Sequence, residues 1–174
     1  MSRRMPAQRP HRSKQDYKTP ADFMEAARRH LQINAFAFDF AADATNHQAA
    51  QWWSETQDAL KQTPETWLAA AAGGWGWLNP PFKDIAPWAQ RCSQLQQLGG
   101  RVAFLVPAGV GANWFTRYVH GKALVLLLNG RLAFIEGHPD ELYPKDCVLA
   151  LYAPDVAAGY KPWRWRRALL RTAA

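Results

Sequence analysis

The chain has 174 residues, 48% of them hydrophobic and 13% aromatic, so it can bury one domain's core, and global disorder is excluded. Its net charge is +7, no apolar run reaches the roughly 18 residues of a membrane span, and two cysteines are too few for a disulfide framework. The N-terminus also lacks the apolar core of a secretory signal. These features predict a soluble, cytoplasmic protein.

The positive charge lies at the two ends of the chain. Residues 1–18 carry six Lys or Arg and one Asp, and residues 161–174 carry five Lys or Arg and no acid, so the middle is mildly acidic. Basic ends on a folded body indicate phosphate contacts, although two solubilising tails explain the charge equally well. We expect a flexible basic arm over 1–16, a folded domain over 17–160 and a basic, aromatic tail over 161–174.

Residues 19–22, Thr-Pro-Ala-Asp, predict the start of a helix, because Thr can cap, Pro suits the first turn and Asp22 occupies a capping-box position. Residues 36–40 alternate in polarity and predict a short strand that ends near an acid. The Ala- and Gln-rich segment 41–60 is expected to be partly helical. The apolar pair before Asn79 predicts a strand, which the two following prolines must end.

The second half of the chain predicts a regular alternation of helices and strands. In order, the patterns indicate a helix over 85–98 ended by Gly99-Gly100, a strand over 101–106, a short helix over 113–119, two strands over 123–128 and 131–135 joined by an Asn129-Gly130 hairpin turn, and a strand over 147–152. Strands alternating with helices and then a hairpin predict an α/β fold with a mostly parallel sheet and an antiparallel hairpin edge.

The motif Asn79-Pro80-Pro81-Phe82 stands between the predicted apolar strand and a helix. Ligands of open α/β sheets bind outside the carboxyl ends of the strands. Two prolines make the turn rigid, so the Asn79 amide and the Pro80 carbonyl can accept both hydrogens of an exocyclic amine while Phe82 stacks on its ring. Accepting these hydrogens makes the amine a better nucleophile. A plain strand-ending turn is the alternative interpretation.

Further blocks accompany this motif in a defined order. They are Tyr17-Lys18-Thr19-Pro20 with Phe23, Phe38-Asp39-Phe40-Ala41-Ala42-Asp43 with Asn46, Asp58-Ala59-Leu60 with Trp67, Ile85 with Trp88, Leu105-Val106-Pro107-Ala108, Trp114-Phe115, and Gly130-Arg131-Leu132-Ala133-Phe134. In this order and spacing, residues 17–153 resemble the phage- and prophage-type, Dam-like DNA adenine N6-methyltransferases. The sequence departs from the family pattern at the cofactor loop, where Ala41, Ala42 and Ala44 replace glycines, and at Asn79 and Phe82, where many such enzymes have Asp and Tyr.

The resemblance implies a Rossmann-like fold with helices on both faces of the sheet. It implies methyl transfer from S-adenosylmethionine to the exocyclic amine of an adenine flipped out of double-stranded DNA, with no metal, in the cytoplasm of a bacterial host cell. Alternatives are a methyltransferase acting on RNA bases or protein glutamine, and a non-catalytic DNA-binding module. The oligomeric state and the recognition sequence do not follow from the sequence.

The resemblance also implies roles for individual residues. Asn79 and the Pro80 carbonyl would hold the target amine, Pro81 would fix the turn, and Phe82 would stack on the base. The expected cofactor-binding residues are Thr19, Pro20, Asp39, Ala41, Asp58 and Asn79. Each has a plainer interpretation, since Thr19 can cap a helix, Asp39 can bind a backbone amide, and Asp58 can be a solvated helix residue.

The basic ends supply the candidate DNA contacts. These are Arg3, Arg4, Arg9, Arg12, Lys14, Arg164, Arg166 and Arg167. Aromatic residues interleaved with Arg over 163–167 suit a nucleic-acid backbone. The alternative is a terminal helix that docks Trp163 and Trp165 on the body of the protein. The sequence contains neither a zinc-ligand spacing, nor a phosphate-binding Gly-Lys-Ser/Thr loop, nor a nucleophile elbow.

Overall fold

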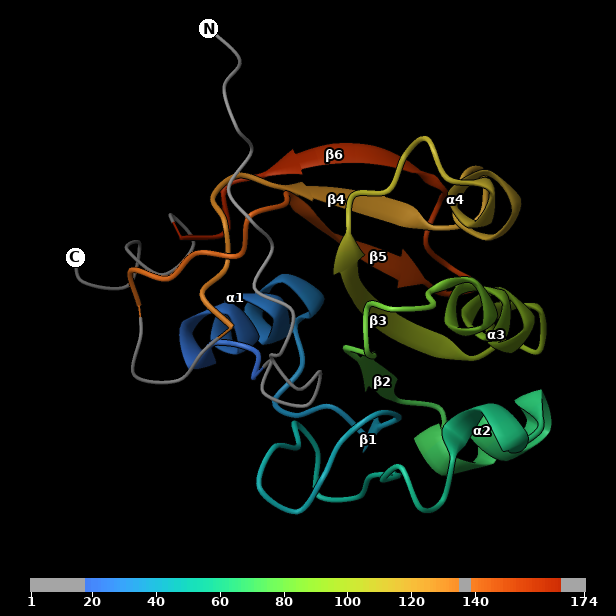
Figure 1. Ribbon diagram of the computed structural model, residues 1–174. Coiled ribbons are helices and arrows are strands. Elements are labelled where there is room, and N and C mark those ends of the chain that lie inside the picture. The colour runs from blue at the N-terminus through green and yellow to red at the C-terminus, as the bar shows by residue number, and fades with distance from the viewer. Residues whose placement is uncertain (1–17, 135–138, 167–174) are drawn as a thin grey trace, which may run out of the picture.

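The computed structural model describes residues 18–134 and 139–166, which form a six-stranded sheet with helices on both of its faces (Figure 1). The strands lie in the order β1-β2-β3-β5-β4-β6. Their bounds are Phe38–Asp39 for β1, Trp75–Leu78 for β2, Arg101–Pro107 for β3, Leu124–Leu128 for β4, Cys147–Tyr152 for β5 and Gly159–Trp163 for β6. The helices are α1 (Ala21–Leu31), the short 3-10 helix η1 (Ala59–Lys61), α2 (Pro64–Ala71), α3 (Ala86–Gln97) and α4 (Asn113–Tyr118).

Five of the described strands run in one direction and β5 runs against them. β1, β2 and β3 pair in parallel, β5 pairs antiparallel with both β3 and β4, and β4 pairs in parallel with β6. The carboxyl ends of β1, β2, β3, β4 and β6 therefore lie along the same side of the sheet, which we call the carboxyl edge. Asn79, directly after β2, and Arg164, directly after β6, both follow strands that end there.

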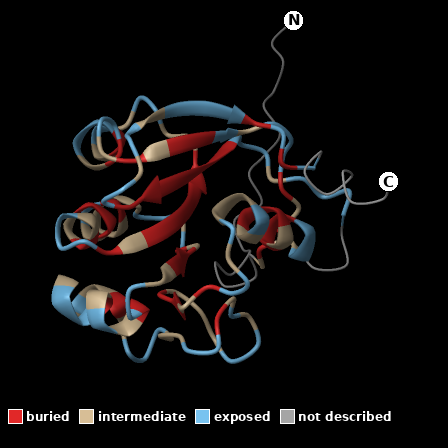
Figure 2. Ribbon diagram, turned by 180° about the vertical axis from the view of Figure 1, so that it is seen from behind, coloured by how far each residue is buried: buried red, intermediate tan, exposed pale blue. Residues whose placement is uncertain are grey.

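Alternate residues of the central strands bury opposite faces of the sheet. In β3, Val102, Phe104 and Val106 join a cluster with α2, α3 and α4, whereas Ala103 and Leu105 join a cluster with α1. β3 and β5 are buried on both faces, which is why both read as nearly continuous apolar runs (Figure 2). The sequence-based prediction of a mixed α/β fold is confirmed.

Most of the predicted elements are present. The helix predicted over 85–98 is α3, the strand predicted over 101–106 is β3, and the strand predicted over 147–152 is β5. After α3, Gly99 adopts a left-handed φ of 87° and the amide of Gly100 donates to the Leu95 carbonyl, so the expected glycine stop is also observed. α1 begins at Ala21 with Pro20 as its N-cap, and the Thr19 side chain does not cap it.

The predicted hairpin over 123–135 is wrong. β4 is present, but residues 131–134 form no strand, and both neighbours of β4 come from later in the chain. Gly130 has a φ of 112°, and the chain after it buries Leu132 and Phe134 in the α1-side cluster. The reversed strand therefore lies inside the sheet, between β3 and β4, and the edge of the sheet is the parallel strand β6.

The segment 41–60, predicted to be partly helical, is irregular over 41–58, with an isolated bridge between Asp43 and Asn46, and enters the 3-10 helix η1 only at Ala59. Sequence analysis did not predict α2 or β6. Thr63 caps α2 by accepting a hydrogen bond from the Thr66 amide, and Pro64 occupies its first turn. β6 begins within the predicted domain and ends within the predicted tail, and its Pro162 is compatible with an edge strand.

Candidate functional site

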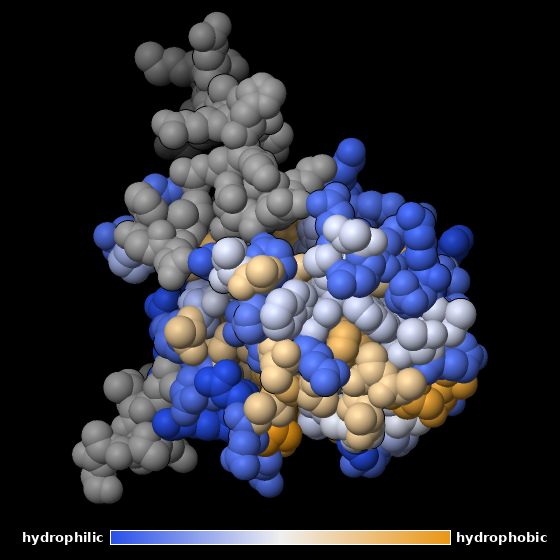
Figure 3. All heavy atoms as spheres, turned by 90° about the horizontal axis from the view of Figure 1, so that it is seen from below, coloured by the Kyte–Doolittle hydropathy of each residue, from blue (hydrophilic) through white to orange (hydrophobic). Residues whose placement is uncertain are grey.

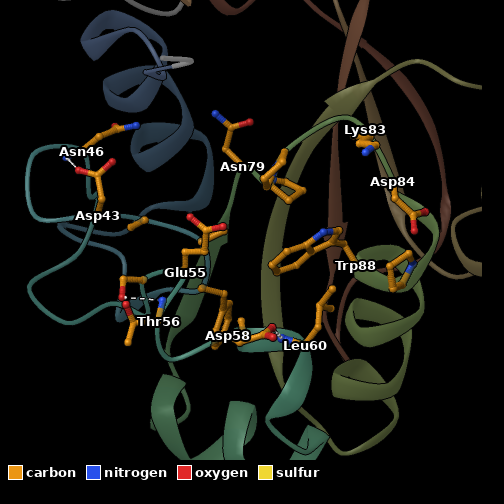
Figure 4. A pocket seen from close by; sticks show the side chains of 18 residues that line it. Asp43, Asn46, Glu55, Thr56, Asp58, Leu60, Asn79, Lys83, Asp84 and Trp88 are labelled. Carbon is orange, nitrogen blue, oxygen red and sulfur yellow. Dashed lines mark hydrogen bonds between the residues drawn. The ribbon is translucent and has the colours of Figure 1, made fainter. Parts of the chain in front are cut away.

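A cavity of about 930 Å³ opens at the carboxyl edge, beside the end of β2 (Figure 4). Its walls come from three segments, which are the irregular chain after β1, the chain around η1, and the turn between β2 and α3 with the first turn of α3. The lining residues are Phe40, Ala41, Ala42, Asp43, Asn46, Ser54, Glu55, Thr56, Asp58, Ala59, Leu60, Asn79, Pro80, Pro81, Lys83, Asp84, Pro87 and Trp88.

Asn79 lies at the mouth of this cavity, where β2 ends. Its Nδ2 donates a hydrogen bond to Oγ1 of Thr19 over 3.1 Å, and its Oδ1 is buried. In Figure 4 the nitrogen of the amide points toward the α1 side and the oxygen points away from it. The two proline rings make the turn after Asn79 rigid. Pro80 is buried and Pro81 is exposed.

Phe82, the fourth residue of the motif, lies away from the cavity lining. Its ring meets those of Phe134 and Tyr143 at centroid distances of 5.9 and 5.6 Å, both edge-on. Phe134 and Tyr143 are also edge-on to each other, at 5.4 Å. The three rings form an aromatic group beside the Asn-Pro-Pro turn, and the stacking of Phe82 on a target base stays a prediction.

Asp39 ends β1 and is almost fully buried. Its carboxylate accepts hydrogen bonds from the amides of Gln48, at 2.9 Å, and Ala41, at 3.2 Å. Burial raises the pKa of Asp39 to about 6 despite these two hydrogen bonds, which act in the opposite direction. Asp39 does not line the cavity. It holds the backbone of the segment that does, which is the plainer of the two roles considered for it.

Asp43 and Asn46 occupy the cavity wall just after this segment begins. Asp43 Oδ1 accepts from the hydroxyl and the amide of Thr45, both at 2.7 Å, and from the amide of Asn46 at 2.9 Å. These hydrogen bonds, the Thr45 hydroxyl first, lower the pKa of Asp43 below its usual value. Asp43 therefore presents an ionised carboxylate to the cavity. Sequence analysis quoted both residues as part of a motif but assigned them no role.

Asp58 lies on the opposite wall. It has a left-handed φ of 45° and caps η1, since its Oδ1 accepts from the amide of Leu60 at 3.2 Å. Its Oδ2 lies 3.2 Å from Nζ of Lys61, which is largely exposed. The carboxylate is only half-buried and lines the cavity. The structure thus brings Asp58, Ala41 and Asn79 together around one space.

The cavity combines apolar walls with an acidic rim. Phe40, Leu60 and Trp88 supply apolar surface, and the Trp88 ring projects into the cavity (Figure 4). Its charged lining residues are four acids, Asp43, Glu55, Asp58 and Asp84, and one lysine, Lys83. Such a lining favours a cationic ligand with a planar apolar part. No local sequence signal marks Glu55 or Asp84, and Trp88 has the spacing of a core residue.

The end of the fold formed by α2 and the irregular chain after β1 presents small patches of weakly hydrophobic residues among hydrophilic ones (Figure 3). Ala69 and Ala72, at the carboxyl end of α2, are among the exposed residues there. The buried ring of Trp67 on the same helix stacks on Phe40 at a centroid distance of 4.0 Å. This stack supports the apolar wall of the cavity from behind.

Thr19 and Pro20 lie outside the cavity lining, although Thr19 contacts Asn79. Among the candidate DNA contacts, Arg164 and Arg166 are exposed and follow the carboxyl end of β6. The remaining candidates lie outside the described residues: Arg3, Arg4, Arg9, Arg12, Lys14 and Arg167.

The aromatic residues between the C-terminal arginines are part of the core. Trp163 and Trp165 are buried, and their rings meet that of Phe23 on α1 at 5.7 and 5.2 Å. The two tryptophans are therefore docked on the body of the protein, but the expected helix is wrong at Trp163, which ends strand β6. The arginines alternate with them and are exposed, and the guanidinium of Arg166 lies over the Trp165 ring, 4.9 Å from its centroid. The same short segment is therefore anchored on one side and basic on the other.

In the described parts of the chain, no helix is long and apolar enough to cross a membrane, and no three His, Cys, Asp or Glu residues are grouped to hold a metal ion. No curated protein matches the sequence. A family model described as DNA N-6-adenine-methyltransferase (Dam) matches residues 7–168, which is nearly the whole chain.

Proposed function

The chain belongs to the DNA N-6-adenine-methyltransferase (Dam) family, and we propose that it transfers the methyl group of S-adenosylmethionine to N6 of an adenine flipped out of double-stranded DNA. Family membership supports methylation of DNA adenine in general. The observation that carries the detailed proposal is the Asn79-Pro80-Pro81 turn at the mouth of the cavity, with the Asn79 amide held by Thr19.

The cavity suits S-adenosylmethionine in size and in charge. A space of about 930 Å³ lies within the range of small-molecule sites, and its acidic rim favours the positively charged sulfonium. Asp43, Asp58 and Ala41 would hold the polar parts of the cofactor, and Leu60 and Trp88 would contact its adenine ring. When bound, the cofactor supplies an electrophilic methyl group. Asp39 would act indirectly, by holding the backbone at Ala41 and Gln48.

The target amine would be held by acceptors of the Asn-Pro-Pro turn. Oδ1 of Asn79 and the carbonyl of Pro80 would each accept one hydrogen of N6, which leaves the nitrogen lone pair available for the methyl group. The bond between this methyl group and sulfur would break, S-adenosylhomocysteine would leave, and N6 would release one of its two hydrogens as a proton. Alignment matters more than acid–base strength in such a transfer, so the rigidity of a diproline turn is itself useful. Phe82 would contact the face of the flipped base as part of the aromatic group with Phe134 and Tyr143.

DNA would approach the carboxyl edge of the sheet. The described chain begins near this edge, since Thr19 contacts Asn79, which follows β2. Strand β6 also ends at this edge. Both basic ends therefore join the fold at the carboxyl edge, where the cavity opens. Phosphate contacts from Arg164 and Arg166 would help to offset the few kcal/mol needed to unstack a base. The five strands of common direction, with helices on both faces, support a Rossmann-like arrangement with its ligand at the carboxyl ends.

The proposal is tested by incubating the full chain with labelled S-adenosylmethionine and unmethylated duplex DNA, digesting the product and separating the nucleosides. Label in N6-methyladenine is the expected result. An RNA of the same sequence and a glutamine-containing peptide are the matched controls. Label in either control but not in DNA would overturn the choice of substrate. Absence of label everywhere, together with no cofactor binding by calorimetry, would support a non-catalytic DNA-binding module instead.

A further inference from the structure

We propose that Arg91 is a positioning residue for the cofactor, because it fixes the width of the slot between Leu60 and Trp88. These two residues line the cavity from η1 and α3, respectively (Figure 4). The inference rests on the proposed function, in which both contact the adenine ring of S-adenosylmethionine. Arg91 itself lies outside the cavity lining, so it acts through the walls.

The Arg91 side chain reaches from α3 to the backbone at the end of η1. Its Nη1 donates to the carbonyl of Gln62, and its Nη2 donates to the carbonyl of Leu60 at 3.3 Å. Its Nε donates to Oε1 of Gln94, on the same helix, at 3.2 Å. A guanidinium can only donate and a carbonyl can only accept, so these contacts have one direction. The guanidinium is therefore held on α3 while it binds two points of the η1 backbone.

The backbone of η1 depends on such partners from outside. A helix of three residues cannot satisfy its own last carbonyls. The Ala59 carbonyl accepts from the indole Nε1 of Trp67 at 2.8 Å, and the next two acceptors, Leu60 and Gln62, accept from Arg91. Ala59 and Leu60 both line the cavity. This wall is thus held from behind by side chains of α2 and α3.

The other wall of the slot is part of the helix that carries Arg91. Trp88 precedes Arg91 by one turn of α3, and Ala89 and Cys92 bury that helix fully in the core. The guanidinium also lies over the buried ring of Trp67, 5.8 Å from its centroid, and that ring meets the Trp88 ring at 6.4 Å. One side chain therefore ties the wall of Leu60 to the wall of Trp88. A slot whose width is set before the ligand arrives lowers the cost of ordering on binding.

Three variants separate positioning from charge and from general stability. Arg91→Met keeps an apolar stem of similar length but donates no hydrogen bond. Arg91→Lys keeps the charge but has one donor atom in place of the guanidinium fork.

Gln96→Met is the matched control for stability. Gln96 is also half-buried on α3, and its Nε2 donates to two carbonyls, those of Lys122 at 2.9 Å and Ala153 at 3.1 Å. None of these three residues lines the cavity. The control thus removes an equivalent attachment of the same helix without touching the slot.

Calorimetry measures the dissociation constants of S-adenosylmethionine and S-adenosylhomocysteine for the wild type and the three variants, well below their unfolding midpoints. We expect Arg91→Met to weaken both ligands about 10-fold, Arg91→Lys about threefold and Gln96→Met less than about twofold. At saturating cofactor, kcat on duplex DNA should stay within about threefold of the wild type, because the loss is one of binding. Without ligand, amide hydrogen exchange over residues 58–62 should be faster in both Arg91 variants than in Gln96→Met.

Wild-type cofactor affinity in Arg91→Met would overturn the inference. An equal loss in Gln96→Met would also overturn it, since the effect would then be one of stability. Wild-type affinity in Arg91→Lys beside a weakened Arg91→Met would assign the effect to charge. If Arg91→Met does not fold, Arg91→Lys carries the test. A wild-type chain that binds neither ligand would remove the proposed function and the inference together, whereas an active wild type with an indifferent Arg91→Met would remove only the inference.

Discussion

Nδ2 of Asn79 lies 3.1 Å from Oγ1 of Thr19, although sixty residues separate them in the chain. The hydrogen bond joins the segment before α1 to the first residue of the Asn-Pro-Pro turn, directly after β2. It places the beginning of the described chain at the mouth of the cavity. A single contact therefore relates the Asn79-Pro80-Pro81 turn to the start of the first helix.

Asn79→Ala should abolish methyl transfer with little effect on folding. The variant loses the acceptor for the target amine and the bond to Thr19, and a loss of one such preorganised group lowers kcat by about 100-fold or more. Calorimetry should still detect cofactor binding, and thermal unfolding should stay cooperative with a somewhat lower midpoint, because the buried Thr19 hydroxyl loses the bond to Asn79. A variant with more than a tenth of wild-type kcat would show that the catalytic assignment of Asn79 is wrong.

Replacement of Arg164 and Arg166 by Gln should weaken DNA binding and flatten its dependence on salt. If each arginine contacts one phosphate, the slope of log K against log salt should fall by about 2 in magnitude. Arg101→Gln is the matched control, because Arg101 begins β3 at the opposite side of the sheet and pairs with Asp155. Equal slopes for the double variant and the control would remove the two C-terminal arginines from the interface.

Asp39 should make stability fall as pH rises. Its pKa is raised from an ordinary 3.8 to about 6, so the folded chain binds a proton there that the unfolded chain releases between these two values. Stability should therefore decrease by roughly 3 kcal/mol from about pH 4 to above pH 6, relative to Asp39→Asn, which cannot ionise. Denaturant unfolding of both proteins across this range measures the difference. A difference that does not change with pH would contradict the raised pKa.

Gly76→Ala should destabilise the fold, because the added Cβ would overlap the ring of Phe40. That ring is stacked on Trp67 and fully buried, so it has little room to move, and overpacking of this kind costs about 1 to 3 kcal/mol. Gly159→Ala is the control, since no atom lies within 4 Å of its added Cβ. Chemical denaturation should separate the two variants, and similar unfolding free energies would contradict the close approach of β1 and β2.

Trp165→Ala should destabilise the protein by about 3 to 5 kcal/mol, as expected for a buried tryptophan. The variant loses the edge-on contact with Phe23, and Arg164→Ala, an exposed neighbour, should leave the unfolding free energy nearly unchanged. Equal stabilities of the two variants in denaturant would mean that residues 163–166 behave as a tail and do not belong to the core.

Local patterns were sufficient where a segment's structure depends on its own residues. The apolar runs of β3 and β5, and the helix between Ala86 and Gln97, follow directly from spacing and end signals. Local patterns failed where residues distant in the chain decide which structure a segment adopts. Asn129-Gly130 favours a hairpin, but β4 already pairs with β5 and β6, so the chain after Gly130 cannot join its edge.

The same distinction holds at the site. The motif at Asn79 and the polar residues after β1 could be found from sequence, because they follow strand ends. Residues 41–58 could not be predicted as an irregular wall, because alanine favours helix and tertiary hydrogen bonds, among them those of the buried Asp39 carboxylate, override that preference. Nor could the hydrogen bond between Thr19 and Asn79 be predicted, since sixty residues separate them in the chain.

The packing of Phe23 against Trp163 and Trp165 joins the first described helix to the last strand. During synthesis, α1 leaves the ribosome long before these tryptophans exist, so the part of its apolar face that they cover remains open until almost the whole chain has emerged. The core on that side of the sheet can then close only after translation has passed residue 165. This long-range closure predicts slow folding and makes incomplete chains prone to aggregation.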